Sequence, residues 1–113
     1  MNTLYLIITL FALGALVGMY LLALVLQKKE TPKFVAFIHG AFVVAALILL
    51  ITYSLQNPGL REAIVLFVIA AIGGLVLIIR DVTAKPIPRW LAVVHGLIAV
   101  SGFIFLLCAA FAK

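Results

Sequence analysis

The chain alternates long uncharged apolar stretches with short charged segments. Four stretches contain no charged residue: 1–27, 34–60, 63–79 and 90–112. A helix that spans a bilayer needs about 17 to 25 predominantly apolar residues, so each stretch is long enough to cross. The pattern predicts an all-α fold, an integral membrane four-helix bundle that forms a single transmembrane domain over residues 1–113.

Composition supports a membrane protein. Hydrophobic residues make up 68% of the chain and charged residues 10%, whereas soluble domains are roughly a quarter charged. The first apolar stretch is not expected to be a cleavable signal peptide. No Lys or Arg precedes Lys28, and the stretch exceeds the roughly 7 to 15 apolar residues of a signal sequence. We expect it to remain as the first spanning helix.

The sequence also contains an internal repeat. Residues 6–57 align without gaps to residues 62–113 at an offset of 56, and 14 of the 52 pairs are identical. Apolar composition accounts for many of these matches, but not for the polar ones and those involving proline or glycine. The informative identities are Lys29/Lys85, Pro32/Pro88, His39/His95 and Gly40/Gly96.

Each repeat is predicted to be one helical hairpin: a spanning helix, a basic loop with a proline, and a returning helix that begins at Phe34 or Trp90. Because two spans return the chain to the starting side, two tandem hairpins have the same orientation. They should be related by a pseudo-twofold axis along the membrane normal. His39 and His95, the only histidines, are then expected at equal depth.

The positive charge is concentrated in two connections. The net charge is +5, and six of the eight Lys and Arg residues lie in segments 28–33 and 80–89. The positive-inside rule places such loops in the cytoplasm, so both termini are expected outside, as in a protein of a bacterial inner membrane. This distribution favours a role in topology over nucleic-acid binding.

The two histidines are the candidate chemistry. An imidazole within a bilayer needs a partner, because unpaired polar groups in hydrocarbon cost several kcal/mol. Five residues past the start of its predicted helix, each lies roughly 8 Å deep at 1.5 Å per residue. One interpretation is a hydrogen bond to a backbone carbonyl of a neighbouring helix or to Tyr20. The other is metal ligation, because a bis-histidine pair in a helical bundle holds haem iron by its two axial faces.

Small side chains surround the predicted histidine level. The residues four and seven positions after the histidines are Val43 and Ala99, then Ala46 and Gly102, so the histidine-bearing faces could accommodate a rigid ring. Gly18 and Gly74 belong to small-xxx-small pairs that favour close helix packing. They would also leave room for the edge of a flat cofactor.

Two repeat-equivalent cations, Lys33 and Arg89, lie six residues before the histidines. With Lys29 and Lys85 behind them, they could neutralise the propionates of a haem at the cytoplasmic surface. The competing interpretation is that these cations only set the topology.

With the histidine pair, the adjoining glycines and the hairpin repeat, the chain resembles small transmembrane b-type cytochromes, whose four-helix cores hold haem b between histidines on separate helices. The resemblance implies one haem b per chain with His39 and His95 as metal ligands. It also implies an electron carrier rather than an enzyme with its own substrate. A quinone or a redox protein would be the partner, with Tyr20 as a candidate for lining a quinone site.

The main alternative is a small accessory subunit of a larger membrane complex, with the histidines as interhelical hydrogen-bonding residues. Small multidrug transporters rely on a membrane-embedded glutamate in their first helix. Such a transporter is disfavoured here, because Glu30, Glu62 and Asp81 all lie at predicted helix ends or in loops. A zinc site would need about three or four ligands, and Cys108 is assigned no role. The sequence leaves open whether the histidines pair within one chain or between chains of a homo-oligomer.

Overall fold

The computed structural model describes residues 2–111, and this part of the chain folds into four α-helices. They are α1 (Asn2–Leu26), α2 (Lys33–Ser54), α3 (Arg61–Val82) and α4 (Arg89–Phe111). All four are long and apolar enough to cross a membrane, which confirms the predicted all-α, four-span architecture. Helices α2 and α4 begin one residue before the predicted Phe34 and Trp90, because each follows directly on a proline, a residue that suits a helix start.

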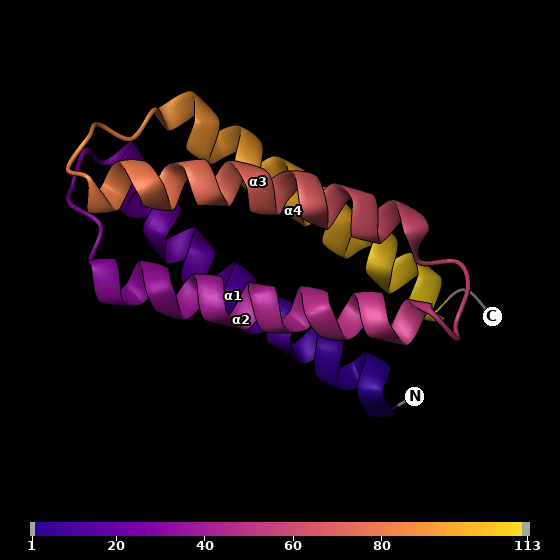
Figure 1. Ribbon diagram of the computed structural model, residues 1–113. Coiled ribbons are helices and arrows are strands. Elements are labelled where there is room, and N and C mark those ends of the chain that lie inside the picture. Colours follow the sequence, from indigo (N-terminus) through magenta and orange to yellow (C-terminus); the bar gives the residue numbers. More distant parts are fainter. Residues whose placement is uncertain (1, 112–113) are drawn as a thin grey trace.

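The helices form a four-cornered bundle (Figure 1). Helix α1 packs against α2 and α4, and α3 packs against the same two helices. The pairs α1/α3 and α2/α4 are therefore diagonal. The α1–α2 and α3–α4 loops lie together at one end of the bundle, and the α2–α3 loop lies with the start of α1 and the end of α4 at the other. We call these the basic end and the terminal end.

Both loops at the basic end begin with the same backbone geometry. Lys28 and Ala84, equivalent in the repeat, are left-handed with φ of 60° and 58°. The amides of Lys29 and Lys85 then bond to carbonyls five residues back, at 2.9 and 2.8 Å. This is the six-to-one bond of a Schellman motif, which satisfies a carbonyl at a helix C-terminus. The equivalence of the hairpins thus extends to the backbone of their turns.

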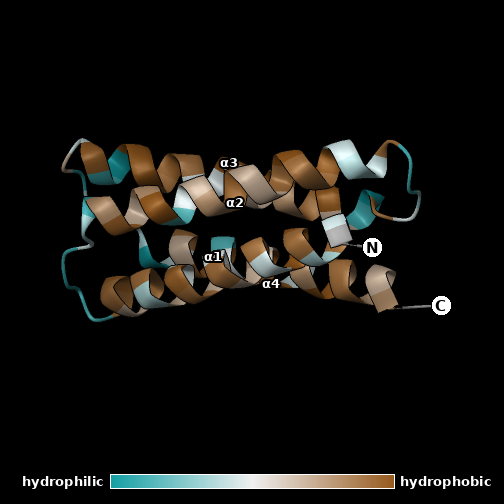
Figure 2. Cartoon of the chain, turned by 90° about the horizontal axis from the view of Figure 1, so that it is seen from below, coloured by the Kyte–Doolittle hydropathy of each residue, from teal (hydrophilic) through white to brown (hydrophobic). Residues whose placement is uncertain are grey.

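The helices consist of hydrophobic residues along most of their length, and most of the hydrophilic positions lie at the two ends of the bundle (Figure 2). The buried core lies mainly in the terminal half of the bundle. Its fully buried large side chains are Ile7, Leu50 and Leu106. In the other half, residues 15–26, 33–45, 71–82 and 89–101 include one buried residue, Ala92. The two halves of the bundle are therefore packed differently.

Phe11 and Phe67 bridge the α1/α3 diagonal. Their rings are stacked, with centroids 3.9 Å apart and an angle of 4° between the planes. The two residues are equivalent in the repeat, so their contact lies on the pseudo-twofold axis between the hairpins. This stack forms the boundary of the tightly packed core on the side of the histidines.

Candidate functional site

His39 on α2 and His95 on α4 make equivalent hydrogen bonds to the partner helix of their own hairpin. His39 Nδ1 lies 2.8 Å from the Gly14 carbonyl oxygen on α1. His95 Nδ1 lies 2.7 Å from the Ala70 carbonyl oxygen on α3. The partners are equivalent in the repeat, as the histidines are, so each hairpin builds the same local site. The sequence interpretation anticipated a backbone carbonyl but could not say which one.

Glycines on α1 and α3 leave the space that the imidazole rings occupy. A Cβ atom at Gly18 would lie 2.8 Å from His39 Cε1, and one at Gly74 would lie 3.0 Å from His95 Cε1. These are closer than ordinary carbon contacts of about 3.5 to 4.0 Å. The space at the two glycines is therefore occupied by the edge of each imidazole. From the sequence, these glycines were expected to leave room for the edge of a flat cofactor. In this structure the histidine rings occupy that space.

The two imidazoles come together within one chain. Their centroids are 6.3 Å apart and their planes are at 85°, across the α2/α4 diagonal. Tyr20 is not part of this group: it lies two residues beyond Gly18, which places it on another side of α1, and its side chain is 52% exposed. The structure thus joins His39, His95, Gly18 and Gly74 and leaves Tyr20 on the outside.

The hydrogen bonds fix the protonation of both rings. A carbonyl oxygen only accepts, so Nδ1 of each histidine must carry the hydrogen. In the neutral ring Nε2 then has a free lone pair. Within residues 2–111 no hydrogen bond is formed by either Nε2, and neither atom is fully buried. A ring held through Nδ1 to a backbone carbonyl is the usual arrangement of a histidine that binds metal through Nε2.

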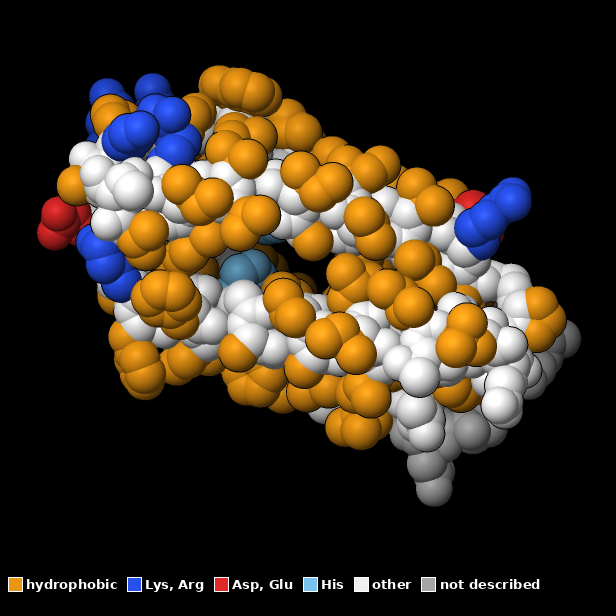
Figure 3. All heavy atoms as spheres, in the orientation of Figure 1, with side chains coloured by type: hydrophobic (Ala, Val, Ile, Leu, Met, Phe, Trp, Pro, Cys, Tyr) orange, Lys and Arg blue, Asp and Glu red, His pale blue; other side chains and the backbone are white. Residues whose placement is uncertain are grey.

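The surface between α2 and α3 is open near this level. Figure 3 shows a gap between these two helices with a histidine side chain at its edge. His39 and His95 both belong to the segments of the bundle in which few residues are buried. The free nitrogens of the pair therefore lie in the less tightly packed half.

Lys33 and Arg89 are the first residues of α2 and α4, and both are exposed at the basic end. They flank the less tightly packed half of the bundle from equivalent positions, although neither contacts a histidine. Among the described residues the one ion pair, Arg61–Glu62 at 3.9 Å, lies at the other end. The cations of the basic end thus have no carboxylate partner in the part of the chain that the structure describes.

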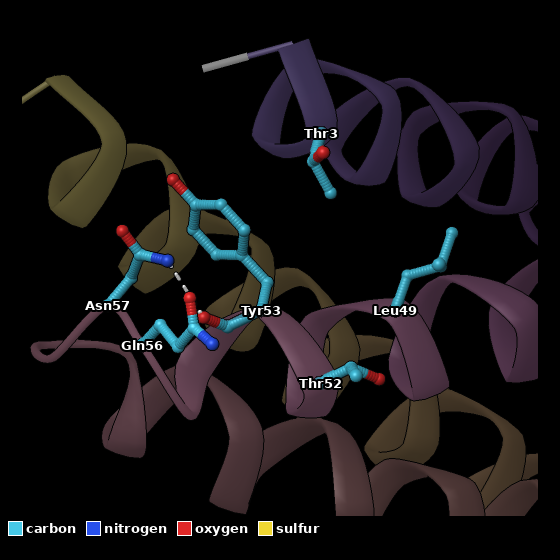
Figure 4. Close-up of a pocket in the computed structure, with 6 residues that line it drawn as sticks. All are labelled: Thr3, Leu49, Thr52, Tyr53, Gln56 and Asn57. Atoms are coloured by element: carbon cyan, nitrogen blue, oxygen red, sulfur yellow. Dashed lines mark hydrogen bonds between the residues drawn. The ribbon is translucent and has the colours of Figure 1, made fainter.

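A separate hollow of about 420 Å³ lies at the terminal end, between the start of α1 and the end of α2 (Figure 4). The hollow is lined by Thr3, Leu49, Thr52, Tyr53, Gln56 and Asn57. All of these side chains except that of Leu49 are polar and uncharged. One polar group is already used, because Asn57 Nδ2 donates to the Tyr53 carbonyl oxygen at 2.9 Å. This hollow is distinct from the histidine pair, which lies toward the opposite end.

Apart from the two histidines, the described residues offer few side chains that could bind a metal ion. Within residues 2–111 no group of three or more His, Cys, Asp or Glu side chains is placed to hold a metal ion, and Cys108 is free and exposed. The histidine pair is thus the candidate ligand set in the part of the chain described. Comparison of the chain with protein-family models, with curated proteins and with solved structures finds no match. Its function has to be inferred from these residues.

Proposed function

We propose that this protein is a membrane b-type cytochrome that binds one haem through His39 and His95 and carries electrons. The observation that carries the proposal is the paired imidazoles, each fixed through Nδ1 and each with a free Nε2. Two such rings on diagonal helices of a membrane-spanning bundle supply the two axial ligands of a haem iron.

The spacing of the pair suits ligation of a single metal centre. Imidazole nitrogens bind transition metals such as zinc at about 2.0 to 2.1 Å, and a ring centroid lies roughly 1 Å behind its nitrogen. Two rings on opposite sides of one metal would have centroids roughly 6 Å apart, and the centroids of His39 and His95 are 6.3 Å apart. The angle of 85° between the rings is no obstacle, because ligation through the two Nε2 atoms does not require parallel ring planes.

The surroundings of the pair also suit a large apolar ligand. His39 and His95 lie within the less tightly packed half of the bundle, so a ring system there would displace little buried packing. The Phe11–Phe67 stack would close the site toward the terminal end. Lys33 and Arg89 are at the end where haem propionates would emerge, and cations there form strong charge-assisted bonds to carboxylates.

The geometry favours electron transfer over substrate chemistry. When bound, the haem would supply a one-electron redox centre. With both axial positions occupied by imidazole, there is no open site for oxygen or substrate. The role of the chain is then to fix the two imidazoles, exclude water and offer an apolar environment within the bilayer.

A second candidate is an accessory subunit in which the histidines only join helices. The bonds from Nδ1 to Gly14 and Ala70 favour this candidate as much as the first, because an interhelical hydrogen bond needs no cofactor. The two candidates differ at Nε2, which is used only in the cytochrome. Proof therefore requires a measurement that reports on Nε2.

The test is an absorption spectrum of protein expressed with ample haem and purified in detergent. We expect a sharp Soret band and a pronounced α band on reduction, and we expect His39→Ala and His95→Ala each to lose the haem or convert it to a five-coordinate form. Lys33→Gln and Arg89→Gln should keep six-coordinate spectra and lower haem retention or shift the potential. Cys108→Ser is the matched control and should not differ from the unaltered protein.

A colourless protein with normal folding would overturn the proposal and favour the accessory subunit. An unchanged reduced spectrum in either histidine variant would show that this residue is not a ligand. Because the two sites are equivalent, unequal severity of the two alanine variants would also count against a symmetric site.

A further inference from the structure

The positions of the histidines and the cations point to the place where electrons enter or leave. This inference rests on the proposed function. His39 lies six residues after the start of α2 and 15 residues before its end, or about 9 Å and 22 Å along the axis at 1.5 Å per residue. His95 lies at the equivalent position of α4. Since electron tunnelling falls steeply with distance, exchange is expected at the nearer, basic end.

That end carries a large excess of positive charge. It holds six Lys and Arg residues and two carboxylates, Glu30 and Asp81, a net charge of +4. Asp81 accepts a hydrogen bond from Thr31 at 3.0 Å. At the terminal end, among the described residues, Arg61 is paired with Glu62. The blue side chains of Figure 3 gather accordingly at the basic end.

The cations of this end are available to a partner. Lys28, Lys29 and Lys85 are exposed and lie in the loops beyond the helices. One cation, Arg80, has an internal use, because its Nε donates to the Pro86 carbonyl oxygen at 2.6 Å. The others have no carboxylate partner within residues 2–111.

We propose that the basic end is the docking surface for a soluble redox protein with an acidic face. A cluster of unpaired charges of one sign steers an oppositely charged partner and raises its association rate by 10 to 10³-fold. The loops carry this charge close to the histidine pair, so a partner held there would lie at the short end of the path. An anionic membrane lipid is the competing occupant, and the test separates the two.

The experiment uses flavodoxin, an acidic electron carrier, as the probe, and cytochrome c as a basic one. Binding to the protein in neutral-lipid nanodiscs is measured first, with and without haem, and the rate of electron exchange with the haem-loaded protein is measured second. We expect flavodoxin to bind and to exchange electrons much faster than cytochrome c at low salt. We expect both effects to fall about tenfold or more toward 0.5 M salt, where the Debye length is only a few ångströms.

The decisive variant is Lys29→Glu/Lys85→Glu, which reverses two equivalent exposed loop charges. It should reduce flavodoxin binding about tenfold at low salt. Arg61→Gln, at the terminal end, is the matched control and should leave binding unchanged. Equal binding by the reversed variant, or no dependence on salt, would overturn the docking surface. If the reversed variant lost co-purified anionic lipid but bound flavodoxin as before, the occupant of the basic end would be lipid, and the proposal would also be overturned. Absence of haem would instead refute the cytochrome, and the binding measurement on haem-free protein would still test the surface.

Discussion

Lys28 and Ala84 hold the same left-handed backbone conformation, with φ of 60° and 58°, although neither is a glycine. Left-handed geometry costs an L-residue with a Cβ about 1 to 2 kcal/mol, and glycine is the usual residue at this position. The chain accepts this cost twice, at equivalent positions 56 residues apart. The turn geometry that returns each hairpin is thus imposed by the packing of the hairpin and not by local residue preference.

Replacing Ala84 with glycine should therefore stabilise the protein. Removing the Cβ relieves the left-handed strain, and the greater freedom of glycine in the unfolded chain offsets part of the gain, leaving about 0.5 to 1 kcal/mol. Thermal unfolding in detergent should shift upward by roughly 2 to 4 °C. Ala71→Gly, in the middle of α3, is the control and should destabilise by about 0.5 to 1 kcal/mol. A lower midpoint for Ala84→Gly would show that the turn is not strained.

Phe11 and Phe67 should be energetically coupled. The two rings pack face to face, so Phe11→Leu and Phe67→Leu should each destabilise the protein. Because residues in contact are coupled by about 0.5 kcal/mol or more, the double variant should cost less than the sum of the two. A double-mutant cycle by chemical denaturation in mixed micelles measures this coupling. Phe34→Leu is the control, since Phe34 is 73% exposed. Strict additivity of the two core substitutions would contradict the stacked contact.

Much of the fold could be predicted because the length of an apolar stretch and the positions of the charged residues can be read directly along the sequence. The uncharged stretches predicted four spans, and the 56-residue offset predicted that the hairpins share their orientation, with the basic loops at one end (Figure 1). The partners of the histidines did not follow, since Gly14 and Ala70 contribute backbone oxygens, which carry no side-chain signal. The Phe11–Phe67 contact did not follow either, because the repeat shows that the two residues are equivalent but not that they face each other between the hairpins.

The orientation in the membrane is a further prediction. The cationic loops at the basic end should lie in the cytoplasm, and the α2–α3 loop should lie outside. In a Cys108→Ser background, single cysteines at Glu30, Thr83 and Gln56 can be labelled with a membrane-impermeant maleimide. Gln56→Cys should react in intact cells, whereas Glu30→Cys and Thr83→Cys should react only after lysis. Labelling of Glu30→Cys and Thr83→Cys from opposite sides would contradict the parallel hairpins.

Gly18 and Gly74 should tolerate an added methyl group poorly. Each faces the Cε1 edge of an imidazole, at 2.8 and 3.0 Å for an added Cβ, so Gly18→Ala or Gly74→Ala must move the ring or separate the helices. Overpacking of this kind costs typically 1 to 3 kcal/mol. It should also weaken the Nδ1 bonds to the Gly14 and Ala70 carbonyls and, in the proposed cytochrome, disturb the axial ligand.

Gly40 supplies a matched control for this substitution. It adjoins His39 in sequence, but a Cβ there meets nothing within 4 Å, so Gly40→Ala adds the same methyl group into open space. Helix propensity then favours alanine by up to about 1 kcal/mol, and thermal stability should hold or rise. If Gly18→Ala and Gly40→Ala had the same effect on stability, the close approach of the imidazole to α1 would be wrong. If Gly18→Ala were destabilising but left a reduced haem spectrum unchanged, the glycine would serve helix packing and not the position of the histidine.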